Sequence, residues 1–255
     1  MGFISINGID LNVNVSGNGY PVILIHGIGG DQTQLKNIAD KLSVNFKVIT
    51  LDCRGHGESD KPATYTLDDH VADILAIMDH FNIQTTYLNG ISMGSYIAQA
   101  VAIAAPERIS KLILTVPKSN GLTSSIQRLI IEHAKELKGL DKHQAILTLL
   151  KYFVYDAEMM KSHINIFETD LTPVQFYAAN KAISGFDFRP DLYKITATTL
   201  VISGKYDGLN SPSEGRICAS LIPGAQFVEM QYSGHAPAYE EHEAYMKLIE
   251  AFLTY

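Results

Sequence analysis

The chain has 255 residues, of which 46% are hydrophobic and 18% charged, so it can bury a large core in a single domain. The formal net charge is −7 and Lys and Arg form no block, which argues against nucleic acid and membrane surfaces as partners. No stretch approaches the roughly 20 apolar residues that span a bilayer, and the first residues do not resemble a signal peptide. The two cysteines, Cys53 and Cys218, lack metal-ligand spacing. We interpret them as reduced thiols of a cytoplasmic protein, although the sequence also permits a disulfide.

The first part of the chain alternates predicted strands with predicted helices. Two short strands, 2–6 and 10–16, are expected to turn at Asn7-Gly8. Apolar and amphipathic runs then predict strands at 22–26, 46–52, 86–89 and 111–116, and helices at 31–42, 68–81 and 92–104. Because strands of the buried type alternate with helices, we expect an α/β fold: a mostly parallel central sheet with helices on both faces.

Residues 118–190 interrupt this alternation. They contain helix-like stretches near 122–138, 141–155, 156–168 and 172–184, without a convincing strand. The alternation then resumes with a strand at 198–204, a helix near 212–221, a strand at 226–230 and a terminal helix from about 240. We therefore predict a core formed by residues 1–117 and 191–255, with 118–190 inserted as a helical cap rather than as a separate domain.

The pentapeptide Gly90-Ile91-Ser92-Met93-Gly94 stands where a predicted strand meets a predicted helix. The pattern G-x-S-x-G alone has little specificity, so its context decides. A strand–turn–helix with small flanking residues holds a serine in a strained conformation, with its hydroxyl above the carboxyl edge of the sheet. Ligands bind at this edge in open α/β sheets, which makes Ser92 a candidate nucleophile.

A serine hydroxyl needs a base to take its proton, and an acid usually orients that base. His235 directly follows the last predicted strand, and Asp207 follows the strand before it, so both are expected at the same sheet edge as Ser92. Their chain order, Ser92, Asp207, His235, is the order of an α/β-hydrolase. The loop after the strand at 111–116 reads "PKSNG" and offers no carboxylate for the same role.

Four other polar residues precede the serine and are interpreted as structural. His26 and His56 lie in loop motifs, where we expect them to hold backbone turns by hydrogen bonds. Arg54 and Asp52 are expected to form a pair that ties one loop together.

Together these features resemble the α/β-hydrolase superfamily in its small, capped branch, which includes esterases, enol-lactonases, perhydrolases and carbon–carbon bond hydrolases. Besides the serine turn, the resemblance rests on "HGIGG" (26–30), "DCRGHGESDKP" (52–62), "PERISKLILTV" (106–116) and the loops of Asp207 and His235. It covers about residues 10–117 and 190–255. In the cap it extends only to position and helical character.

The resemblance implies an oxyanion hole formed by the backbone N–H groups of Ile28 and Met93. The glycines of "HGIGG" do not match a dinucleotide fingerprint, because Gln32 stands where the third glycine would be. Two positions depart from the family pattern. Ser95 stands where a second glycine is frequent, and His242 stands where a proline is common and is interpreted as a different helix start.

The expected function is that of a serine hydrolase acting on a small or medium ester, lactone or related acyl compound, with no metal or organic cofactor. A dehalogenase is disfavoured because it would need a carboxylate at position 92. The alternative is a small-ligand receptor or signalling regulator of the same fold with slow hydrolysis. The cap histidines His133, His143 and His163 are expected to be solvated, whereas one or two cap aromatics, with Phe176 as a candidate, are expected to face the substrate.

Overall fold

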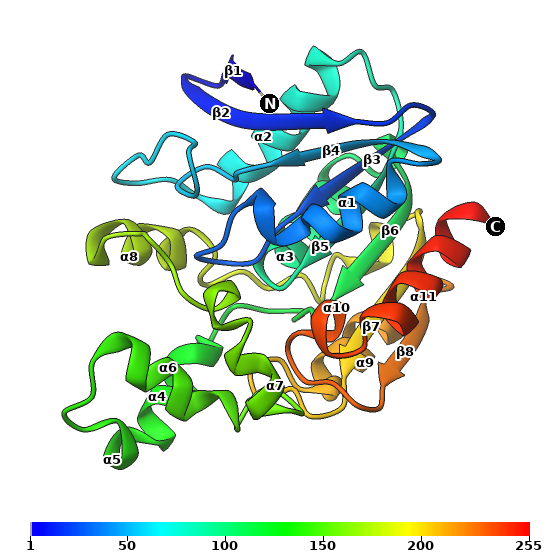
Figure 1. Ribbon diagram of the computed structural model, residues 1–255. Helices are drawn as coiled ribbons and strands as arrows, with labels where there is room; N and C mark the ends of the chain where they lie inside the picture. Colours follow the sequence, from blue (N-terminus) through cyan, green and yellow to red (C-terminus); the bar gives the residue numbers. More distant parts are fainter. Residues whose placement is uncertain (1) are drawn as a thin grey trace.

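The computed structural model describes residues 2–255 and is built around one eight-stranded sheet. The strand order is β1-β2-β4-β3-β5-β6-β7-β8, and all neighbours from β4 to β8 are parallel. The strands are β1 (Gly2–Ile6), β2 (Ile9–Ser16), β3 (Tyr20–Ile25), β4 (Phe46–Leu51), β5 (Thr86–Ile91), β6 (Ile109–Thr115), β7 (Thr198–Gly204) and β8 (Gln226–Met230). The predicted α/β class and mostly parallel sheet are therefore confirmed (Figure 1).

The antiparallel edge of the sheet begins with the predicted hairpin. Asn7 and Gly8 both have positive φ angles, 50° and 74°, as a two-residue turn between antiparallel strands requires. β2 then pairs with β4, also antiparallel, so the hairpin closes one side of the parallel sheet.

Helices cover both faces of the sheet, because successive side chains of each strand point to opposite sides. On β3, Ile23 and Ile25 enter one buried cluster, whereas Val22 and Leu24 enter another. The first cluster is shared with α2 (Leu67–His80), α3 (Met93–Ala104) and the end of α9 (Pro212–Leu221). The second is shared with the 3-10 turn η1 (Gln32–Leu35), α1 (Lys36–Leu42), α10 (Pro237–Glu240) and α11 (His242–Thr254). The sheet is thus the middle of three layers (Figure 1).

Residues 118–190, which we call the cap segment, leave the sheet after β6 and return before β7. Their helices are α4 (Ser125–Glu132), α5 (Ala134–Leu137), α6 (Lys142–Leu150), α7 (Ala157–Lys161), η3 (Ile164–Ile166) and α8 (Pro173–Ala182). An isolated bridge between Asn120 and Asp187 joins the two ends of the segment. Two further short 3-10 turns, η2 (Pro106–Arg108) and η4 (Leu192–Lys194), flank core strands. Figure 1 shows α4 to α7 as one group, with α8 nearer the sheet.

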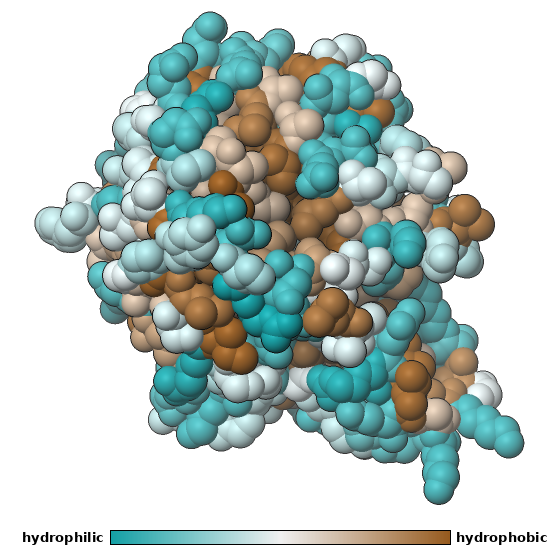
Figure 2. Space-filling view, turned by 180° about the vertical axis from the view of Figure 1, so that it is seen from behind, coloured by the Kyte–Doolittle hydropathy of each residue, from teal (hydrophilic) through white to brown (hydrophobic). Residues whose placement is uncertain are grey.

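Several large apolar side chains are exposed on the cap segment, among them Leu122, Ile131, Val174 and Tyr177. On the face opposite to that of Figure 1, hydrophobic residues gather toward the middle and hydrophilic residues dominate the periphery (Figure 2). Within residues 2–255, no helix is both long and apolar enough to cross a bilayer. Cys53 and Cys218 are buried free cysteines, as predicted.

The predicted pair of Arg54 and Asp52 is wrong. Arg54 instead makes a two-pronged ion pair with Asp73 of α2, with N···O distances of 2.9 and 2.7 Å. Asp52 accepts hydrogen bonds from the backbone N–H groups of Gln32 and Glu58. Helix α2 packs beside the loop and brings Asp73 to the guanidinium, a contact that no local sequence pattern reveals.

We predict that Asp73→Asn lowers the free energy of unfolding by about 3–5 kcal/mol, because it leaves the buried Arg54 charge without a partner. Urea denaturation measures this. The control is Asp79→Asn, since the Asp79 side chain is 68% exposed and its ion pair with Arg108 is worth less than about 1 kcal/mol. Equal effects of the two substitutions would contradict the prediction.

Candidate active site

Ser92 occupies a strained turn between β5 and α3. Its φ and ψ angles are 53° and −116°, a combination that a residue with a side chain adopts only when its surroundings impose it. The Ser92 N–H donates to the Thr115 carbonyl of β6 at 3.0 Å, and the Ser92 carbonyl accepts from the Ser95 N–H at 2.8 Å. The serine side chain is only partly buried, so a substrate can reach its hydroxyl.

The two glycines of the turn are required by close backbone contacts. A Cβ on Gly90 would collide with the carbonyl of Gly94, and a Cβ on Gly94 would collide with the carbonyl of Ile25 at the end of β3. Glycine at both positions therefore lets the first turn of α3 lie directly against β5 and β3.

The structure brings the three predicted site residues together. His235 Nε2 lies 3.0 Å from Ser92 Oγ, and His235 Nδ1 lies 2.8 Å from Asp207 Oδ2. Because an ionised carboxylate only accepts, Nδ1 carries the proton and Nε2 is free to accept from the serine hydroxyl. The side chain of Asp207 is fully buried and that of His235 is 10% exposed, so water competes little for this chain of hydrogen bonds.

The other oxygen of Asp207 is held by its own loop. Asp207 Oδ1 accepts hydrogen bonds from the backbone N–H groups of Leu209 at 2.8 Å and Asn210 at 2.9 Å. These bonds fix the carboxylate plane, so Oδ2 is aimed at the imidazole.

The two predicted oxyanion-hole residues, Ile28 and Met93, directly follow Gly27 and Ser92 in the chain. Gly27 packs against the serine, since a Cβ at Gly27 would lie 3.6 Å from Ser92 Cβ, and Ile28 follows it. Met93 is the first residue of α3, where an N–H has no acceptor within the helix. Among the described residues, neither amide donates to another backbone carbonyl outside the regular elements. Both are therefore available to a ligand oxygen.

His26 and His56 hold backbone turns, as predicted. The Nε2 atom of His26 accepts from the Cys53 N–H at 3.0 Å, and its Nδ1 lies 2.7 Å from the Gly27 carbonyl. His56 Nδ1 lies 3.0 Å from the Arg54 carbonyl. Burial lowers the pKa of His26 and lowers that of His56 to about 3, so both imidazoles stay neutral. Among the described residues, neither imidazole is hydrogen-bonded to Ser92.

The two departures from the family pattern have local roles. Ser95 is fully buried and its hydroxyl donates to the Ser92 carbonyl at 2.6 Å, which adds a bond to the strained turn. His242 is the first residue of α11, which confirms its interpretation as a helix start.

Sequence reasoning missed a buried polar link between Asp207's loop and α3. The side-chain amide of Asn210 donates to the hydroxyl of Tyr96 and to the carbonyl of Val116, both at 2.7 Å. Both side chains are buried, and burial raises the pKa of Tyr96. An asparagine three residues after the candidate acid is the only sequence signal, and it does not identify the partners.

The cap segment lies against the candidate oxyanion loop. A Cβ at Gly29 would lie 3.1 Å from Thr169 Cβ and 3.5 Å from Phe176 Cε2. The Gln34 side chain also donates to the Ile166 carbonyl at 3.1 Å. Residues 166–176 therefore lie against the loop that follows β3, beside Ile28.

The three cap histidines differ in their surroundings. His143 and His163 are exposed, as predicted, and His143 pairs with Glu168. His133 departs from the prediction, since its ring stacks on that of Tyr152 with centroids 3.5 Å apart. The imidazole is thereby partly covered.

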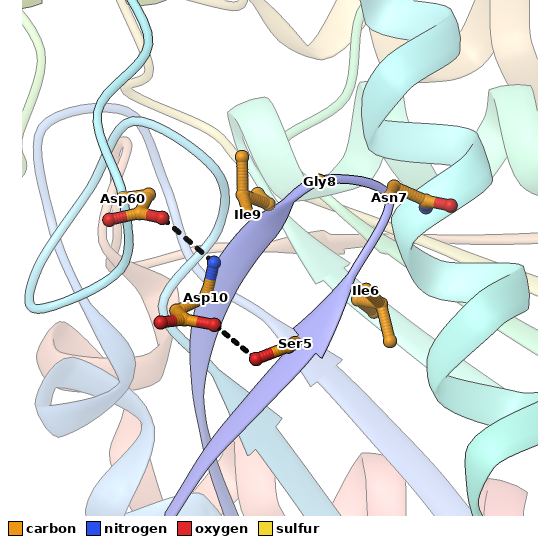
Figure 3. A pocket seen from close by; sticks show the side chains of 7 residues that line it. All are labelled: Ser5, Ile6, Asn7, Gly8, Ile9, Asp10 and Asp60. Atoms are coloured by element: carbon orange, nitrogen blue, oxygen red, sulfur yellow. Dashed lines mark hydrogen bonds between the residues drawn. The ribbon is translucent and has the colours of Figure 1, made fainter.

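Two surface cavities lie away from Ser92. One, of about 300 Å³, surrounds the β1–β2 turn and is lined by Ser5, Ile6, Asn7, Gly8, Ile9, Asp10 and Asp60 (Figure 3). Its carboxylates serve the hairpin, because Asp10 accepts from Ser5 and Asp60 accepts from the Asp10 N–H. The other, of about 350 Å³, is lined by Lys118, Thr123, Ser125, Arg128, Gly208, Leu209, Ser211 and Glu214. Neither cavity is lined by a histidine that could take a serine's proton, so the candidate site remains at Ser92.

Comparison with known families agrees with this geometry. The model of the alpha/beta hydrolase fold family matches residues 20–242. The chain belongs to this family. The match includes Ser92, Asp207 and His235, the whole cap segment and the part of the core between residues 20 and 242.

Relatives within the alpha/beta hydrolase family carry out different hydrolyses. A 2-hydroxy-6-oxononadienedioate/2-hydroxy-6-oxononatrienedioate hydrolase of Cupriavidus pinatubonensis is 28% identical, over 91% of this chain and 86% of its own. An enol-lactonase from Burkholderia xenovorans LB400 is 27% identical, with a TM-score of 0.85 over the whole of both chains. An esterase from Exiguobacterium antarcticum is 25% identical, with a TM-score of 0.86 over the whole of both chains.

Proposed function

We propose that this protein is a serine hydrolase that cleaves a small or medium carboxylic ester, lactone or related acyl compound through an acyl-enzyme. The observation that carries the proposal is the chain of hydrogen bonds from Ser92 through His235 to Asp207. The ester, lactone and dienedioate hydrolases among the relatives support it as a class of reaction. We also propose that the protein is located in the cytoplasm.

The mechanism follows from the positions of the donors and acceptors. Ser92 Oγ attacks the carbonyl carbon while His235 Nε2 takes the hydroxyl proton. Asp207 holds the imidazole in the required tautomer and stabilises the imidazolium. The amides of Ile28 and Met93 bind the developing oxyanion, and each such donor is worth roughly 3 kcal/mol. His235 then protonates the leaving group, and water repeats the sequence on the acyl-enzyme.

The nucleophile is tested with a fluorophosphonate probe. We expect one covalent label on Ser92, and Ser92→Ala should abolish both labelling and turnover of p-nitrophenyl acetate. The matched control is Ser95→Ala in the same turn, which should still be labelled. Labelling that survives Ser92→Ala would overturn the assignment, whereas a single slow burst without turnover would favour the receptor alternative.

The role of Asp207 is tested by Asp207→Asn, which keeps the shape of the side chain but removes the charge that fixes the imidazole tautomer. We expect kcat to fall by a factor on the order of 10⁴. Steady-state kinetics on p-nitrophenyl acetate measure this. Full activity in this variant would mean that another group orients His235.

The contacts of the cap segment favour short to medium acyl groups. Thr169 and Phe176 stand against Gly29, beside the amide of Ile28. An acyl chain bound to Ser92 would extend beneath these side chains. Each CH₂ of the acyl chain that becomes buried adds about 0.8 kcal/mol of favourable binding free energy. Once the chain reaches the side chains of the cap segment, further CH₂ groups clash with them.

We therefore predict that kcat/KM passes through a sharp maximum in a p-nitrophenyl ester series with acyl chains of about two to sixteen carbons, because each added CH₂ buries more apolar area until the chain meets the cap segment. Phe176→Ala should move the maximum to longer chains. Tyr177→Ala, at the neighbouring position where the side chain is 71% exposed, should leave it in place. Rates that still rise at the longest chain would show that the cap segment does not limit the pocket.

A further inference from the structure

Glu240 joins the loop of His235 to the cap segment. This glutamate is the last residue of α10, five residues after His235. Its Oε2 accepts from the Gly234 N–H at 2.7 Å, and its Oε1 accepts from the N–H groups of Tyr155 at 2.6 Å and Asp156 at 3.1 Å. One carboxylate thus holds the backbone immediately before the candidate base and the backbone between α6 and α7.

The same stretch of the cap segment also contacts the backbone of both site loops. The His235 N–H donates to the Phe153 carbonyl at 2.7 Å. A Cβ on Gly234 would collide with this carbonyl, and a Cβ on Gly208 would collide with the carbonyl of Tyr152. The loops of Asp207 and His235 therefore meet on one short piece of the cap segment.

Three tyrosine rings also link the cap segment to the loops of Asp207 and His235. The ring of Tyr155 lies 4.9 Å from that of Tyr206, in the loop of Asp207, and 5.8 Å from that of Tyr232, in the loop of His235. All three tyrosines are exposed, and Glu240 is half-buried. Burial raises the pKa of Glu240, while its backbone N–H donors act in the opposite direction and favour the charged form.

We propose that Glu240 is a positioning residue for the reaction: its carboxylate holds the His235 loop on residues 152–156 of the cap segment, and so keeps Nε2 within reach of Ser92 Oγ. The inference rests on the proposed function, because it takes His235 as the base. It makes the cap segment part of the support for the base as well as a cover for the substrate.

Both carboxylate oxygens are needed for this role. Glutamine has a single acceptor oxygen, and its NH₂ group would face an N–H donor wherever it replaced Oε1 or Oε2. Glu240→Gln therefore leaves either Gly234 or the Tyr155–Asp156 pair without an acceptor. Since an unsatisfied donor at a partly buried junction is unfavourable, the His235 loop and the cap segment should separate.

The test measures p-nitrophenyl acetate turnover and the rate of fluorophosphonate labelling for Glu240→Gln. We expect kcat and the labelling rate to fall together by about ten- to a hundredfold, with KM nearly unchanged, because the displaced base acts in the transition state. The control is Glu241→Gln. Glu241 accepts one backbone N–H, from Tyr232, and the glutamine oxygen can keep that bond, so parental rates are expected.

Circular dichroism and urea midpoints establish that each variant is folded at the assay temperature. If Glu240→Gln does not fold, Glu240→Asp is used to test the positioning role. Its shorter side chain keeps both carboxylate oxygens but cannot reach all three N–H donors. That variant should show the same joint fall of kcat and labelling, to a smaller degree. Parental kcat, or a raised KM with unchanged kcat, would overturn the role of Glu240. Activity that survives Ser92→Ala would instead overturn the proposed function.

Discussion

The turn at Ser92 depends on backbone segments that approach one another too closely to admit a side chain. Gly90 and Gly94 remove the Cβ atoms that would otherwise separate β5, α3 and the end of β3. This contact places the first amide of α3 beside the loop after β3. Without it, Ser92 would lie on an ordinary strand-to-helix connection, farther from the loop that carries Gly27. The strained φ of Ser92 is the local consequence.

The parallel sheet brings the three candidate site residues together, because the carboxyl ends of its strands lie at one edge. Ser92 follows β5, Asp207 follows β7 and His235 follows β8, so residues 143 positions apart in sequence become hydrogen-bonded. The cap segment then closes on this edge from two sides. Residues 166–176 contact the loop after β3, and residues 152–156 contact the loops of Asp207 and His235.

The insertion of 118–190 was predicted as helical, and it is, but its helix boundaries were predicted less well than those of the core. The predicted helix at 122–138 divides at His133, and the stretch at 156–168 forms α7 and a short 3-10 turn. The core helices pack on the sheet, which gives them a clear apolar periodicity. Several cap helices are short, since α5, α7 and η3 have 4, 5 and 3 residues, and a segment of one turn is too short for apolar periodicity to mark its ends.

The sequence by itself determined the elements of the core, the turn at Ser92 and the order of Ser92, Asp207 and His235. Each of these depends on local pattern, namely apolar periodicity, glycine at a tight turn and a polar residue just after a strand. Only the tertiary structure decided the pairing of Arg54 with Asp73, the link from Asn210 to Tyr96 and the three donors of Glu240. Apart from Gly234, these partners are well separated in the chain. Which residues pair depends on how helices and loops pack at the sheet edge. The spacing of two residues along the sequence does not give the distance between their side chains in the folded protein.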